Sequence, residues 1–72
     1  MYNGHKNKNQ WNVSLWINNT ESMYNEAVRL VKAYGQAKAA RMMYRNLEGT
    51  RTPDGARYSR IAIFNALDGI LD

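Results

Sequence analysis

The segment from Trp11 to Ile17 constrains what this chain can fold into more than any other. It places five large apolar side chains, both tryptophans among them, within seven residues of a 72-residue chain. A chain of this length forms at most one domain and buries roughly 60% of its unfolded surface, so its stability is marginal. The hydrophobic core is therefore expected to form around this segment.

The periodicity of this segment fits two structures. Every second residue from Trp11 to Ile17 is apolar, as in a strand, but the pairs Trp11–Leu15 and Val13–Ile17 are also spaced like neighbours on a helix. No other segment alternates convincingly, and a strand without a partner would leave its backbone groups unpaired. We therefore predict a short helix. The alternative is a dimer in which two copies of the segment pair as strands.

Capping residues and glycines mark further helices. Asn18 and Glu21 have the spacing of a capping box, which indicates a helix over 21–34 that ends at Gly35. A helix rich in alanine, methionine and arginine, all good helix formers, is predicted over 36–47.

The last predicted helix follows a turn. Pro53 fixes its own φ, and the Asp-Gly pair after it favours a tight reversal, so 50–55 is predicted to be a turn. Ser59 is a suitable N-cap for a helix over 60–71. The predicted buried stripe of this helix is Ile61, Phe64, Leu67 and Leu71.

These elements predict one all-α domain over residues 1–72, a small bundle of three to four short helices. Residues 1–10 are polar and are expected to form an irregular arm. No apolar run, the longest being 61–64, is long enough for a membrane-spanning helix or a signal peptide, so we expect no membrane partner. Without cysteine, a domain this small relies on well-packed helices or on oligomerisation.

Sequence patterns for catalysis are lacking. The chain has no cysteine, a single histidine at His5 and scattered carboxylates, which is a poor ligand set for a transition metal. The serines have no neighbouring base in the sequence, and there is no glycine-rich phosphate loop. We therefore expect a protein that is not an enzyme, with no catalytic residue, metal or cofactor.

Positive charge is concentrated between residues 38 and 60. This segment has six cations and two carboxylates, and so carries the whole net charge of +4. Arg57 and Arg60 flank a predicted helix N-terminus, where cations are unfavourable by about 0.3–1 kcal/mol and anions are favoured. We predict a surface that binds nucleic acid, a nucleotide or an acidic protein, formed by Lys38, Arg41, Arg45, Arg51, Arg57, Ser59 and Arg60.

Trp11 and Trp16 form a second candidate site. Two tryptophans so close together are difficult to bury together in a small domain. At least one is expected to stay accessible until a partner or a second copy of the chain covers it, because exposed aromatic side chains commonly anchor protein interfaces.

The sequence Trp-Asn-Val-Ser-Leu-Trp-Ile-Asn-Asn at 11–19, followed by Glu21 and Tyr24, resembles a motif of small bacteriophage and prophage proteins of unassigned function. The similarity extends to 52–59 and so covers most of the chain. It implies an accessory phage protein in the cytoplasm of the infected bacterial host. Such a protein would act as a host-takeover or anti-defence inhibitor that binds a host or defence protein, or its nucleic-acid or nucleotide component.

Residues 40–67 are similar to the helix-turn-helix-like segment of large serine recombinases, mainly in Thr-Pro-x-Gly at 52–55 and in Tyr58-Ser59. In that family a helix, this loop and a second helix contact DNA, so the resemblance implies nucleic-acid binding as the alternative function. Asp54 departs from the family's basic loop residue, and the helix that follows is apolar. DNA contacts would therefore be directed to phosphates rather than to base edges.

Overall fold

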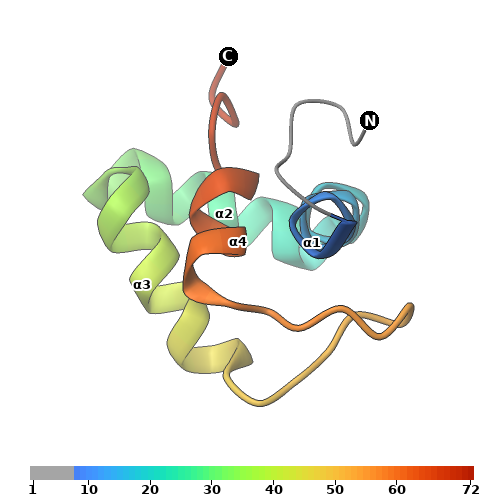
Figure 1. Cartoon of the computed structure of the whole chain (residues 1–72). Coiled ribbons are helices and arrows are strands. Elements are labelled where there is room, and N and C mark those ends of the chain that lie inside the picture. Colours follow the sequence, from blue (N-terminus) through green and yellow to red (C-terminus); the bar gives the residue numbers. More distant parts are fainter. Residues whose placement is uncertain (1–7) are drawn as a thin grey trace.

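The computed structural model describes residues 8–72, which fold into four helices (Figure 1). They are α1 (Lys8–Asn19), α2 (Glu21–Tyr34), α3 (Gln36–Leu47) and α4 (Arg60–Ala66). The all-α class is confirmed, and the bounds of α2 and α3 match the prediction. The ambiguous segment 11–17 lies within α1 and is helical.

Helix α4 lies between α1 and α3 (Figure 1) and packs against both of them. Helix α2 also contacts α1 and α3, so the four helices close around one core. Large side chains in this core include Val13 and Ile17 from α1 and Ile63 from α4. Small side chains supply much of the remainder and allow helix backbones to approach closely. The buried alanines are Ala27, Ala39, Ala40, Ala62 and Ala66.

The tryptophan segment contributes less to this core than the sequence suggests. Val13 and Ile17 are fully buried, but Trp11 and Trp16 are only partly buried. Helical geometry explains the difference, because residues four apart lie on the same face while the residues between them turn away from it. Both tryptophans thus remain partly accessible in the isolated chain.

The start of α1 departs from the prediction. Residues 8–10 are helical, so the irregular arm expected over 1–10 is wrong for these three residues. Residues 1–7, and with them His5, lie outside the described part of the chain. The helix extends to Lys8 because Asn9 and Gln10 have distant partners: Asn9 bonds to the backbone of Arg57, and the Gln10 side-chain oxygen accepts from Asn65 Nδ2 at 2.9 Å.

The junction of α1 and α2 also differs in detail. The expected capping box is not formed, because the Asn18 amide donates to the Ser14 carbonyl oxygen within α1 at 2.8 Å. Thr20 is the N-cap residue, with no capping bond from its side chain. The predicted stop at Gly35 is confirmed: its φ is 87°, and its N–H donates to the Val31 carbonyl oxygen at 2.9 Å.

Helix α4 is shorter than predicted. It ends at Ala66 rather than Leu71, and tight turns follow, in which the Asp68 N–H bonds to the Asn65 carbonyl and the Ile70 N–H to the Leu67 carbonyl. Gly69, with φ of 72°, lies in the left-handed region and prevents the helix from continuing.

The buried face of α4 is also different from the predicted stripe. Ala62, Ile63 and Ala66 face the core, and of the predicted residues only Leu67 is buried. Ile61 is 57% exposed and Phe64 39% exposed. Two large apolar side chains therefore lie on the outer face of α4.

Candidate functional site

The loop between α3 and α4 is a tight turn, as predicted. The Thr52 carbonyl accepts from the Gly55 N–H, and the Thr52 N–H donates to the Ala56 carbonyl, each at 2.8 Å. An antiparallel bridge joins Arg51 to Arg57. Gly55 has φ of 91°, a conformation that side-chain-bearing residues rarely adopt. The turn therefore brings the two arginines close to each other.

Helix α1 holds this turn through the Asp54 carboxylate. Asn12 Nδ2 and Trp16 Nε1 both donate to Asp54 Oδ2, each at 3.0 Å. The bond from Asn12, then that from Trp16, lowers the pKa of Asp54, because both bonds favour the charged form. The indole N–H of Trp16 is thus already bonded to the loop in the isolated chain.

A buried bond continues this connection. Asn12 and Thr52 are 5% and 4% exposed, and Thr52 Oγ1 donates to Asn12 Oδ1 at 2.5 Å. The same hydroxyl oxygen accepts from the Ala56 N–H at 3.0 Å. Both ends of the Asn12 amide are therefore used, one on Asp54 and the other on Thr52.

Asn9 pairs with the backbone of the loop as a neighbouring strand would. Its Nδ2 donates to the Arg57 carbonyl at 3.0 Å, and its Oδ1 accepts from the Arg57 N–H at 2.9 Å. Asn9, Asn12 and Trp16 are spaced so that they share one face of α1. We call these three residues, with Thr52 and Asp54, the α1–loop clamp.

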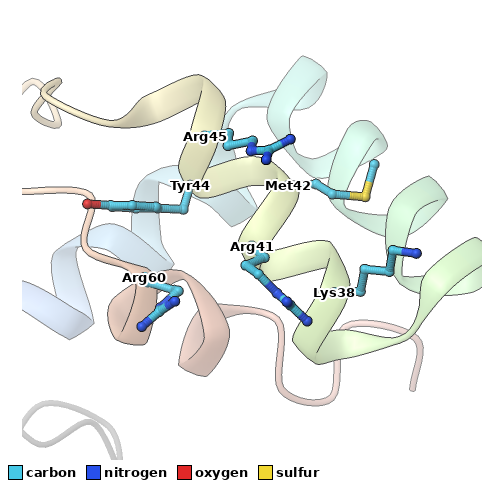
Figure 2. A pocket seen from close by; sticks show the side chains of 6 residues that line it. All are labelled: Lys38, Arg41, Met42, Tyr44, Arg45 and Arg60. Atoms are coloured by element: carbon cyan, nitrogen blue, oxygen red, sulfur yellow. The ribbon is translucent and has the colours of Figure 1, made fainter.

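The structure gathers the predicted cations around adjoining hollows. Lys38, Arg41 and Arg45 from α3 and Arg60 from the start of α4 line a hollow of about 520 Å³, together with Met42 and Tyr44 (Figure 2). In Figure 2 the Arg41 and Arg60 side chains diverge from their two helices, Arg41 to the lower right and Arg60 to the lower left. Tyr44 also lines a second hollow, of about 270 Å³, with the two loop arginines Arg51 and Arg57.

A third hollow shares two of its lining residues with the first. Arg41 and Arg60 also line a space of about 360 Å³ between α3 and α4, together with Ala37, Ala40, Ile61 and Phe64. No carboxylate is among the residues that line these three hollows. We call the cations that line them the basic surface: Lys38, Arg41, Arg45, Arg51, Arg57 and Arg60.

Ser59 and Asp54, which follow the cations of α3 in the sequence, each accept hydrogen bonds that hold the fold. Ser59 Oγ accepts from the Ala62 N–H at 3.2 Å and so caps α4, as predicted, while its part in anion binding stays a prediction. Asp54 lies in a separate hollow of about 560 Å³ with Trp11, Lys8 and Asn9. The Asp54 charge therefore faces α1 and is not among the groups that line the basic surface.

The sequence analysis did not predict the α1–loop clamp, nor that apolar side chains are exposed on the outer face of α4. A polar stripe runs beside the apolar one on α1 and consists of Asn9, Asn12 and Trp16, at i, i+3 and i+7. This spacing indicates a second contact face on the helix. The partners of these three residues in the loop were not apparent, since the bonds span 38 to 48 positions.

The described part of the chain offers neither a metal site nor a membrane span. Within residues 8–72, no group of three or more His, Cys, Asp or Glu side chains is arranged to hold a metal ion. None of the four helices is long and apolar enough to cross a membrane.

The family model that matches this sequence covers residues 1–71. The chain belongs to DUF7249, a family of unknown function. Comparisons with curated proteins and with solved structures found no significant match. The function of this DUF7249 protein must therefore be inferred from its surface chemistry.

The clamp predicts the effect of a nearly isosteric substitution. Asn12→Asp replaces the donor at 3.0 Å from Asp54 Oδ2 with a second carboxylate oxygen. We expect it to lower the free energy of unfolding, since the Asp54 carboxylate loses one of its two donors and gains a like charge beside it. Urea denaturation at neutral pH measures this. In an Asp54→Ala background the same substitution should cost much less, because the acceptor and the like charge are both absent. An equal cost of Asn12→Asp in both backgrounds would contradict the clamp.

Acid should weaken the clamp. The pKa of Asp54 is lowered in the folded chain, so its carboxylate stabilises the fold above the ordinary value of 3.8, and this contribution is lost as pH falls below that value. Asp54→Asn lacks the charge at every pH. We expect the difference in thermal midpoint between the natural chain and Asp54→Asn to be largest near neutral pH and to shrink below 3.8. A difference that does not change with pH would show that the charge of Asp54 contributes nothing.

Proposed function

We propose that this chain is a non-enzymatic binding protein that engages the anionic face of another macromolecule through the basic surface. The observation that carries the proposal is the gathering of six cations, from two helices and a clamped loop, around hollows whose lining residues include no carboxylate. Like charges held together in this way repel one another, and an anionic partner removes that cost on binding.

The class of target that we propose rests on the phage resemblance. Residues 11–19 and 52–59, which carry it, are the segments joined by the α1–loop clamp. The resemblance supports a target in the cytoplasm of an infected bacterium: a host or defence protein, or its nucleic-acid or nucleotide component. The protein would then act as a host-takeover or anti-defence inhibitor, by occupying a surface that its target needs.

Nucleic-acid binding is the second candidate. It is favoured by the order of α3, loop and α4, which follows the resemblance to serine recombinases, and by the two loop arginines on the basic surface. The exposed side chains of α4 count against base reading, because Ile61 and Phe64 offer no hydrogen bonds to base edges. Nucleic acid would therefore be held through its phosphates, and an acidic protein is the partner that we favour.

The basic surface predicts which charges matter. Arg41→Glu with Arg57→Glu should greatly reduce retention on immobilised polyglutamate and heparin. The matched control is Arg29→Glu with Lys32→Glu, on the exposed face of α2, which changes the net charge equally. We expect the control to keep most of its retention, measured as the salt concentration at elution. Thermal midpoints should change little, because exposed charges contribute little to stability. Equal losses in both double variants would contradict the proposal, since net charge alone would explain the retention.

A further inference from the structure

The outer face of α4 presents apolar side chains beside the basic surface. Ile61 is 57% exposed and Phe64 is 39% exposed, and their i, i+3 spacing places them on one side of the helix. They line the hollow of about 360 Å³ between α3 and α4. An exposed apolar patch next to charged groups is typical of an interaction site rather than of ordinary surface.

Alanines on α3 leave the space for this hollow. Ala40 is 1% exposed, whereas Ala37 is exposed, and both line the hollow opposite α4. Longer side chains at these positions would fill the space between the helices. The result is an apolar groove, lined by Ala37, Ala40, Ile61 and Phe64, with Arg41 and Arg60 beside it.

We propose that this groove binds an acidic amphipathic helix of a partner protein. Apolar side chains of that helix would insert between Ile61 and Phe64, and its carboxylates would pair with Arg41 and Arg60. This inference rests on the proposed function and names the class of partner that the basic surface recognises. An apolar centre with arginines at its edge is the usual composition of a protein-binding site.

Charge selects this occupant over a second copy of the chain. A symmetric dimer through the groove would bring each copy's Arg41 and Arg60 close to those of the other, and like charges across an interface are strongly unfavourable. An acidic partner meets the same arginines with opposite charge.

The backbone also favours a helix over an extended peptide. An extended peptide binds by adding a strand to a free sheet edge. The groove lies between two helices and offers no such edge, since the one bridge in residues 8–72 joins Arg51 to Arg57 in the loop. A helix instead presents apolar side chains three and four residues apart, which suits a seam between two helices.

Selection from a displayed library of random peptides tests this inference. Peptides of about 16 residues span about 24 Å as a helix, close to the 25 Å intermediate extent of the molecule. We expect enriched sequences to carry Asp or Glu together with Leu, Ile, Phe or Trp at helical spacing. A random oligonucleotide pool, selected in parallel under the same salt, is the second arm. Enrichment of oligonucleotides with no acidic peptides would overturn the inference and leave anion binding standing.

Substitutions separate the contribution of the apolar groove to peptide binding from that of the basic surface. Ile61→Ser with Phe64→Ser should weaken binding of a selected peptide by about tenfold or more, as for truncated interface anchors. Tyr24→Ser, at a 37% exposed aromatic side chain on α2, is the control and should bind like the natural chain. Thermal midpoints check that each variant is folded.

The possible results distinguish this inference from the proposed function. If peptides bind the Ile61–Phe64 variant as tightly as the natural chain but lose binding with Arg41→Glu and Arg57→Glu, the groove has no role and the basic surface alone binds anions. If neither change affects binding, both the groove and the proposed function are wrong. Loss with both changes, and not with Tyr24→Ser, supports both.

Discussion

One carboxylate oxygen, shared between two donors, connects the loop between α3 and α4 to α1. Asp54 Oδ2 accepts from Asn12 and Trp16 and so fixes the turn against α1. The turn connects α3 to α4, and α4 packs between α1 and α3. The chain has no disulfide to fix this loop, and Tyr58 is the large side chain by which the loop joins the core, at 5% exposed. Directional hydrogen bonds from polar side chains perform the role that a disulfide has in many small domains.

Local signals predicted the middle of the chain well and its ends poorly. The bounds of α2 and α3 follow from Gly35 and from helix-forming composition, which act within a few residues. The start of α1 depends on Asn9, whose partner lies 48 positions away, and on Gln10, whose partner lies 55 away. Rules based on nearby residues cannot detect such bonds, so these polar residues were read as an irregular arm.

The candidate site was predictable in its charge and not in its shape. The concentration of cations between residues 38 and 60 was sufficient to predict the basic surface. Its apolar neighbour was missed because Ile61 and Phe64 were assumed to be core residues. In this structure Ala62 and Ala66 take the inner positions of α4, since small side chains allow it to pack closely between α1 and α3. Hydrophobicity alone ranks phenylalanine above alanine for burial and so gives the wrong face.

The way in which Arg57 is anchored separates folding from recognition. Asn9 bonds to the backbone N–H and carbonyl of residue 57 and makes no demand on its side chain. Main-chain groups are common to almost all amino acids, so position 57 tolerates side-chain exchange while the loop keeps its conformation. A related chain can therefore change the charge of the basic surface at this position without rebuilding the scaffold. An engineer can use the same tolerance to vary that charge at a single exposed position.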